Sequence, residues 1–219
     1  GNRFVTAAKQ LVAGRVAIDM LAGPSELLII ADDSADPATI AADLLAQAEH
    51  DPDAIPTLVT TDASLPARVN AELALQLQSL PTAAIARAAL ANGFACLVDS
   101  IDQAIGCSDE IAPEHLEVLT RDAAAIADRC SSYGAIFIGS CAAEVFGDYG
   151  IGPNHTLPTG GTARSFAGLS VFTFLKARTF LRSGGSGPSP ALVADIARFA
   201  RLEGLEAHAR AAERRNSPS

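Results

Sequence analysis

Tryptophan is absent from this chain of 219 residues, and aromatic residues make up only 5% of it. Because 49% of the residues are nevertheless hydrophobic, we expect a core built mainly from Ala, Leu, Ile and Val. Basic residues are also scarce: 16 Lys and Arg stand against 25 Asp and Glu, which gives a net charge of −9. Without a basic stripe, the chain is a poor candidate for binding the phosphate backbone of nucleic acids.

Long hydrophobic runs are missing as well. No apolar stretch approaches the length of a membrane span, and residues 1–5 lack the apolar segment of a signal peptide. The cysteines, which are Cys96, Cys107, Cys130 and Cys141, have neither CxxC nor zinc-finger spacing, so we expect reduced, buried thiols. These features favour a soluble, cytoplasmic protein without a membrane or nucleic-acid partner.

Short apolar runs alternate with stretches of helical periodicity along much of the chain. Asp36 and Pro37 are typical of a helix start, with a capping side chain followed by proline in the first turn. The alternation predicts an α/β fold, in which a largely parallel sheet is covered by helices. The predicted strands are 27–30, 57–60, 95–98, 116–119 and 135–139, and the predicted helices between them are 36–48, 65–80, 82–91, 100–105 and 122–130.

The two ends of the chain depart from this pattern. A helical stretch at 5–12 opens the sequence without a preceding strand, so we expect an incomplete Rossmann-like domain, the later part of something larger. Near the other end, the Gly-, Ser- and Pro-rich residues 183–190 predict a linker. Ser189 is a suitable cap for the helix that follows, which begins a C-terminal helical arm.

The pair Glu114-His115, which follows a proline, is the most informative feature of the sequence. Histidine titrates near neutrality, so it can take up and return a proton at working pH. A neighbouring glutamate can polarise a water molecule. For an isolated Glu-His dipeptide, a solvated surface loop is the simpler interpretation, and the surrounding sequence has to decide between the two.

Two further regions contain potential metal ligands. Gln47 and His50 are three residues apart on a predicted helix and share a face, so they could hold a metal together. Because glutamine is an uncommon zinc ligand, a polar helix end is the alternative. Asp148 and His155 lie in the Gly- and Pro-rich stretch 147–161, which predicts a long irregular loop of the kind that is often functional. The alternative for Asp148 is an aspartate that only organises a turn.

The remaining candidates are more dispersed. Glu203 and His208 flank Gly204 in the last helical region, where an exposed helix face is the simpler interpretation. Ser25 follows a Gly-Pro turn that could present its hydroxyl to a ligand. Two histidines, one aspartate and one glutamine can complete a four-ligand zinc sphere. No G-x-G-x-x-G fingerprint of dinucleotide binding follows a predicted strand.

Taken in order, the motifs of this chain resemble those of histidinol dehydrogenase. They are 18–26, 44–51, 112–117, 147–149 with 152–159, and 203–209, and together they extend over essentially the whole sequence. The resemblance implies zinc binding by Gln47, His50, Asp148 and His208, a general base in His115, and water activation by Glu114. It also implies that the substrate contacts are Ser25, Gln47, His50, Glu114, His115, Asp148, His155, Glu203 and His208, and that Asn2 contacts NAD.

The family oxidises L-histidinol to L-histidine in two steps with two NAD, and its zinc holds the imidazole and amine of the substrate. Its enzymes are homodimers in which the last helical region reaches the partner's site, so Glu203 and His208 are expected to complete a second copy's site. Because family chains are considerably longer, residues 1–24 are expected to be the remnant of a second nucleotide-binding-like domain. Residues 25–168 would then form the main α/β domain, and residues 169–219 the helical, dimerising arm. Two alternatives stay open: a related dehydrogenase for another polar alcohol, such as a sulfonated diol, and a non-catalytic zinc-binding fragment.

Overall fold

The computed structural model describes residues 3–152, 154–182 and 187–216. It divides into two compact units, Gly1–Phe174 and Leu175–Ser219. Asn2 lies outside the described residues. Whether residues 1–24 belong to a second, nucleotide-binding-like domain stays a prediction.

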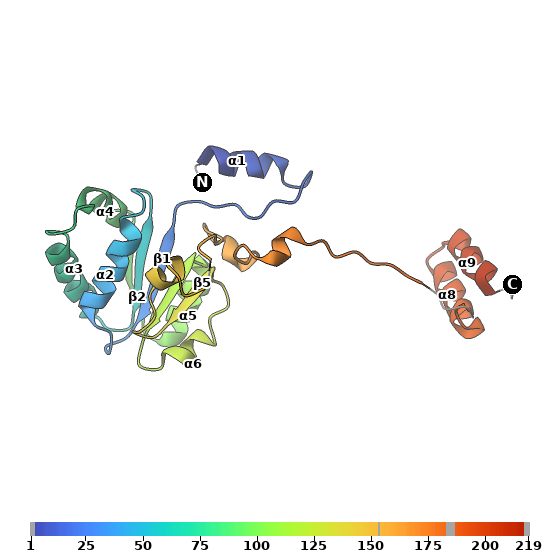
Figure 1. Cartoon of the computed structure of the whole chain (residues 1–219). Helices are drawn as coiled ribbons and strands as arrows, with labels where there is room; N and C mark the ends of the chain where they lie inside the picture. Colours follow the sequence, from blue (N-terminus) through green and yellow to red (C-terminus); the bar gives the residue numbers. More distant parts are fainter. Residues whose placement is uncertain (1–2, 153, 183–186, 217–219) are drawn as a thin grey trace. The chain divides into compact units, whose positions relative to one another are not determined.

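The first unit is built around a parallel sheet of five strands, which confirms the predicted α/β fold (Figure 1). Along the sheet the strand order is β3-β2-β1-β4-β5. This order places β1 and β4 side by side, although residues 32–114 separate them along the chain. The strands are β1 (Glu26–Ala31), β2 (Ile55–Thr60), β3 (Phe94–Leu97), β4 (His115–Leu119) and β5 (Ala135–Ile138).

Helices cover both faces of the sheet, as expected for parallel strands (Figure 1). Alternate side chains of β1 divide between two cores: Leu27 and Ile29 pack with α2, α3 and α4, whereas Leu28 and Ile30 pack with α5 and α6. The sheet is therefore hydrophobic on both faces. The helices are α2 (Pro37–Ala48), α3 (Leu65–Gln76), α4 (Ala83–Leu90), α5 (Ile101–Ile111), α6 (Ala123–Ala127) and, after β5, the short α7 (Glu144–Asp148).

Local sequence explains the helix boundaries. Asp36 caps α2 by accepting hydrogen bonds from the N–H groups of Ala38 and Thr39, with Pro37 in the first turn. In α5 the prediction was too short: the helix continues past the predicted end at residue 105 as far as Ile111. The buried Ser108 and the partly buried Cys107 and Ile111 hold this second half of α5 against the core. The left-handed Ala112 (φ 52°), which precedes a proline, ends the helix.

The loop predicted at 147–161 is largely irregular, but its first two residues differ from the prediction. Gly147 and Asp148 form the end of α7, because Gly147 packs closely against the Phe137 ring, where a larger residue would not fit. The stretch 172–181 contains only a short 3₁₀ turn, η2 (Val171–Phe174). In the described residues, no helix combines the length and apolar character that crossing a bilayer requires.

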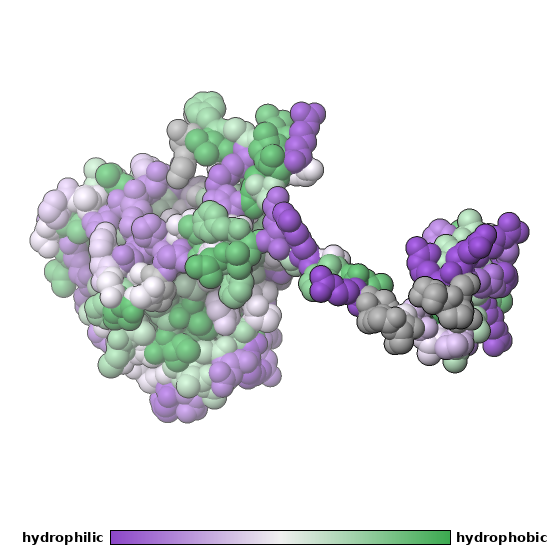
Figure 2. All heavy atoms as spheres, turned by 45° about the vertical axis from the view of Figure 1, so that its right-hand side comes forward, coloured by the Kyte–Doolittle hydropathy of each residue, from purple (hydrophilic) through white to green (hydrophobic). Residues whose placement is uncertain are grey.

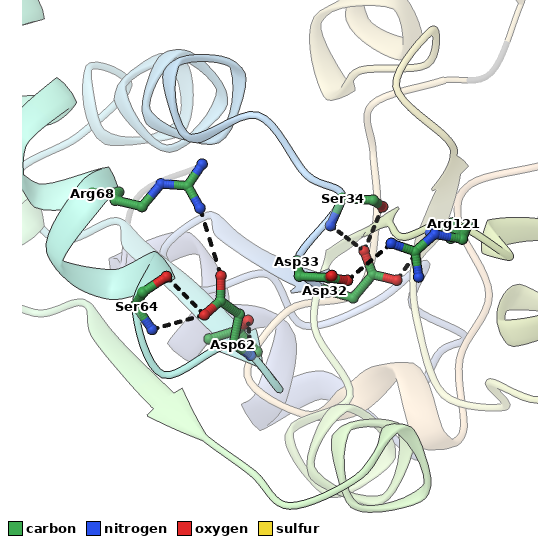
Figure 3. A network of polar contacts seen from close by, with 8 residues as sticks. Asp32, Asp33, Ser34, Asp62, Ser64, Arg68 and Arg121 are labelled. Carbon is green, nitrogen blue, oxygen red and sulfur yellow. Dashed lines mark hydrogen bonds and ion pairs between the residues drawn. The ribbon is translucent and has the colours of Figure 1, made fainter.

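The carboxyl ends of the central strands are occupied by a polar network of the protein itself (Figure 3). Asp32, just after β1, accepts hydrogen bonds from the N–H groups of Ser34 (2.9 Å) and Arg121 (3.0 Å). The Arg121 guanidinium pairs with Asp33 at 3.1 Å. In open α/β sheets, ligands usually bind beyond the carboxyl ends of the strands, at the point where the strand order reverses. Here the carboxylates at the carboxyl ends already have partners within the protein. The candidate site residues gather instead at the amino ends of the strands.

The second unit contains two α-helices, α8 (Pro190–Leu202) and α9 (Glu206–Glu213), and the short 3₁₀ helix η3 (Arg214–Asn216). Ser189 caps α8 by accepting a hydrogen bond from the Leu192 N–H, as predicted. Arg201 joins the two helices through ion pairs with Glu206 (2.9 Å) and Glu213 (2.8 Å). Within the described part of this unit, Ala197, Ala200 and Ala209 form the buried cluster, and Val193 on α8 is also buried.

Candidate active site and metal centre

The pairing of β1 with β4 creates the site. Leu27 stands opposite His115 in the parallel register, so the residues just before β1 meet those just before β4. Ser25 and Glu26 are thereby brought beside Glu114, which lies far away in sequence. Helix α2 runs back toward this same edge of the sheet, because it connects two parallel strands.

Glu114 and His115 are both buried, so they do not form a solvated loop. Glu114 Oε2 accepts a hydrogen bond from the Glu26 N–H at 3.1 Å. His115 Nδ1 lies 3.2 Å from the Glu26 carbonyl oxygen. Because a carbonyl can only accept, Nδ1 carries the proton and Nε2 is the basic nitrogen. The β1 backbone therefore orients both side chains.

Burial moves the proton affinities of this pair in opposite directions. It raises the pKa of Glu114 to about 7, with the negative charges of Glu26 and Asp148 adding to the effect. It lowers the pKa of His115 to about 4, against the opposing influence of the Glu26 carbonyl. A low-dielectric surrounding disfavours the charged form of either group. At neutral pH, His115 is thus a neutral proton acceptor, and Glu114 lies near the midpoint of its titration.

Potential metal ligands surround this pair. One ligand atom from each of His50, Glu144 and Asp148 lies within 4.8 Å of the others. His50 Nε2 is 3.9 Å from Asp148 Oδ2, and 45% of the His50 side chain is exposed. Gln47, one turn before His50, is fully buried and faces Glu144. A nitrogen and several oxygens at this spacing suit a divalent metal of the zinc type.

Three acidic groups lie close together here: Glu117 and Glu144 are buried, and Asp43 is half-buried. Burial, together with the charges of Glu117 and Asp148, raises the pKa of Glu144 to about 9. Burial likewise raises the pKa of Glu117, and the neighbouring Asp43 carboxyl on α2 adds to this. One oxygen of Glu117 accepts the Glu144 N–H at 2.8 Å, whereas the other has no partner within the described residues. The side of the site facing α2 therefore holds an unusual density of carboxyl groups.

A pocket of about 330 Å³ opens onto these groups, within the size range of small-molecule sites. Besides Glu114 and His115, it contains two further residues of the predicted substrate set that lie outside the metal cluster, Ser25 and His155. The exposed Tyr149 also lines it. Apart from Gln47, which is buried against Glu144, the structure brings the described site residues predicted in the first unit together around one pocket. Its lining residues are Ser25, His50, Glu114, His115, Glu144, Asp148, Tyr149 and His155.

Comparison with known proteins shows the origin of this arrangement. The model of the family described as histidinol dehydrogenase matches residues 1–216. The chain belongs to the histidinol dehydrogenase family. It is 53% identical over 218 residues to the histidinol dehydrogenase of Nitratidesulfovibrio vulgaris and 49% identical over 211 residues to that of Synechococcus. The two matches cover 99% and 95% of this chain, and 50% and 48% of the respective relatives.

A solved structure agrees with these relatives. The crystal structure of histidinol dehydrogenase from Elizabethkingia anophelis superimposes with a TM-score of 0.91 at 42% sequence identity. This match covers 98% of the present chain and 50% of the other. The chain therefore spans about half the length of the family members it matches.

Two predicted site residues belong to the second unit. Glu203 caps the end of α8 and His208 lies on α9, and both line a surface pocket of about 540 Å³ together with Phe199 and Leu205. The zinc and substrate roles predicted for them from the histidinol dehydrogenase motifs stay predictions. The NAD contact predicted for Asn2 falls outside the described residues.

Two residues of the pocket, Glu144 and Tyr149, were not singled out from the sequence. One feature of the sequence could have indicated Glu144: it is the lone acidic residue within the otherwise apolar run 142–146. A carboxyl group buried with such a run needs a polar partner. Its four-residue spacing from Asp148 would also place both on one helix face. Tyr149 directly follows a predicted ligand in the loop, but nothing in its local sequence indicates that it faces a pocket.

Proposed function

We propose that this chain carries the zinc-binding and acid-base residues of an enzyme that oxidises L-histidinol to L-histidine with two NAD. The main support for this proposal is the buried Glu114-His115 pair, which shares a pocket with the cluster of His50, Glu144 and Asp148. A proton acceptor beside a potential metal site suits the oxidation of an alcohol that also binds the metal. We keep the cytoplasm as the expected location of this reaction.

The donor set fits zinc. Imidazole nitrogen and carboxylate oxygen are ordinary zinc ligands, and an amide oxygen from Gln47 would add a neutral one. We propose Gln47, His50 and Asp148 as ligands from the first unit, with His208 as the fourth. When bound, zinc would hold the imidazole and amine of histidinol, and so convert binding energy into orientation.

His115 is the proposed base in both oxidation steps. In the first step the alcohol loses a hydride to one NAD and a proton to His115, leaving an aldehyde. The low pKa of His115 keeps Nε2 unprotonated at neutral pH. The Glu26 carbonyl holds the ring through Nδ1, so the basic nitrogen is available to the pocket.

Glu114 is the proposed activator of water between the two steps. The aldehyde takes up one water to form a hydrate, which then loses a second hydride to NAD and a further proton to leave the carboxylic acid. A carboxyl group with a pKa of about 7 is suited to accepting a proton from that water near neutral pH. Only this part of the reaction needs a water molecule.

We also propose that the enzyme works as a homodimer in which Glu203 and His208 of one copy complete the site of the other. Two observations support this. Both residues lie in a unit separate from the one that contains the remaining ligands. The same unit exposes large apolar side chains beside them, namely Phe199 (64%), Leu202 (76%) and Leu205 (42%).

Zinc analysis of purified protein tests the metal assignment. We expect about one zinc per site in the wild type and a large loss in His50→Ala. His155→Ala is the matched control, because His155 lines the same pocket but is not a proposed ligand. Equal zinc contents in wild type and His50→Ala would rule out the proposed ligand set.

Substrate identity needs a separate assay. NADH formation should be followed with histidinol and with a sulfonated diol, using this chain alone and a longer protein that contains it. Turnover of histidinol supports the proposal, and turnover of the diol alone would favour the related dehydrogenase. Zinc binding without turnover in either form would favour a non-catalytic role.

A further inference from the structure

Glu144 is the most deeply placed acidic residue of the pocket, and neither the acid-base roles nor the proposed ligand set uses it. It is the first residue of α7 and only 4% exposed. Burying a carboxyl group is costly unless specific contacts compensate. The groups that contact the Glu144 carboxyl group therefore indicate its role.

Its principal partner is the side-chain amide of Gln47. With the amide nitrogen turned toward α7, Gln47 donates to the two carboxyl oxygens of Glu144 at 3.1 and 3.0 Å. With Glu144 ionised, as a bound cation would hold it, the opposite orientation would bring the amide oxygen against two carboxyl oxygens that can only accept. Because the oxygen and nitrogen of an amide lie on opposite sides of its carbon, Gln47 Oε1 then points away from Glu144.

A contact with the sheet fixes the position of Glu144. Its N–H donates to Glu117 Oε1 at 2.8 Å, and Glu117 is a fully buried residue of β4. On the same short helix, Asp148 lies one turn further on, so α7 links the Gln47 contact to a proposed metal ligand. A chain of contacts thus runs from β4 through α7 to α2.

We propose that Glu144 is the positioning residue of the metal site, which locks the Gln47 amide so that its oxygen faces the metal. This inference rests on the proposed zinc-binding function. An amide binds a metal through oxygen, whereas its NH₂ group has no free lone pair to offer, so a freely rotating Gln47 would present the wrong atom part of the time. Glu144 removes that alternative, and both of its oxygens are used in doing so.

The test measures metal affinity by competition with a chelator. Loss of an outer-sphere partner typically weakens metal binding about 10- to 100-fold, and we expect this for Glu144→Gln, whose NH₂ group would oppose that of Gln47. Glu110→Gln is the matched control, since Glu110 is exposed on α5. Glu144→Asp, which keeps a carboxyl group but withdraws it from Gln47, should also weaken binding and serves if Glu144→Gln does not fold.

Cobalt spectra separate a positioning role from direct ligation. At saturating Co²⁺, the d–d absorption of Glu144→Gln should match that of the wild type, because the set of bound atoms is unchanged. A changed spectrum would make Glu144 a ligand, and an unchanged metal affinity in folded Glu144 variants would deny it any role. Either result overturns the inference while leaving zinc binding intact. A wild type that binds no zinc, or a His50→Ala variant that binds it normally, would instead overturn the proposed function.

Discussion

At the scale of single residues, the site depends on buried groups whose proton affinities are moved away from their ordinary values. Glu114 and His115 are neighbours in sequence, yet burial shifts their pKa values toward each other's ordinary range. Both shifts follow from the cost of a charge in a low-dielectric surrounding. The pair therefore offers a neutral base and a carboxyl group that titrates near neutrality.

This division of labour predicts different effects for two conservative substitutions. His115→Asn should slow both oxidation steps by about 10²- to 10⁴-fold, the usual contribution of a general base. Glu114→Gln should impair oxidation of the aldehyde more than that of the alcohol, since only the aldehyde must be hydrated. Assays of active enzyme that start separately from each compound would measure this, and equal losses for Glu114→Gln would contradict the separate roles.

Glu117 predicts a pH dependence of stability in the metal-free protein. Burial and the nearby Asp43 raise its folded-state pKa above the ordinary 4.5. The folded state then binds more protons than the unfolded state above pH 4.5, so the free energy of unfolding falls as pH rises. Glu117→Gln, which can still accept the Glu144 N–H, should weaken this dependence, to which Glu114 and Glu144 also contribute. It should stabilise the protein by on the order of 1–3 kcal/mol at alkaline pH.

Urea unfolding with a chelator present, at about pH 5 and about pH 8, would measure the effect. Glu110→Gln serves as the exposed control. A Glu117→Gln protein whose stability falls with pH as steeply as that of the wild type would show that another group causes the dependence.

At the scale of secondary-structure elements, close backbone approach beside β4 holds the catalytic pair in place. A Cβ atom on Gly134 would lie 2.5 Å from the Glu114 carbonyl oxygen and 3.1 Å from the Leu157 Cβ. The same carbonyl accepts the Ala135 N–H at 2.9 Å. Glycine is therefore required where β5 begins, because no side chain fits between it and the residue that starts the site.

Two glycine-to-alanine substitutions should consequently act in opposite directions. Gly134→Ala should destabilise the protein by about 1–3 kcal/mol, since backbone atoms must move apart. Gly106→Ala should stabilise it by about 0.5–1 kcal/mol, because alanine favours the helix and nothing lies within 4 Å of the new atom. Thermal unfolding would measure both, and a neutral Gly134→Ala would mean that the β4 edge adapts easily.

At the scale of the whole molecule, both units expose large apolar side chains. Figure 2 shows hydrophobic surface on each of them, including α1 (Arg3–Val12) at the top of the view. Surface of this kind commonly marks contacts with other protein. Strongly exposed examples are Leu11 on α1, Tyr149, Phe172 and Phe174 in the first unit, and Phe180, Leu181 and Leu202 in the second.

If His208 of one copy completes the site formed by His50 of another, two inactive variants should complement each other. His50→Ala and His208→Ala should each lose tight zinc binding. After unfolding and refolding of an equal mixture, random pairing yields one intact site in half of the dimers, or about a quarter of all sites. Mixing two His50→Ala samples is the control. No recovery of tight binding in the mixture would place His208 in its own copy's site.

The order and type of the elements could be predicted from local sequence. Apolar runs between turn signals predicted β1, β2 and β4, and Asp36-Pro37 predicted the start of α2, because these signals act within one turn or strand. The motif residues also indicated the family that the comparisons confirm. The full length of α5 was missed, because contacts with the sheet stabilise its second half.

Only the tertiary structure determined where these residues meet. Parallel pairing of β1 with β4 joins Glu26 to Glu114 and His115 across nearly 90 positions, and it does so at the amino ends of the strands. The alternation of β4 directs His115 and Glu117 toward α2, but their burial depends on what packs there. Glu144 shows this most clearly, since its effect on Gln47 arises from a contact between α7 and α2 that neither local sequence encodes. Local propensity acts over a few residues, whereas burial and hydrogen-bond partners depend on segments that folding brings together.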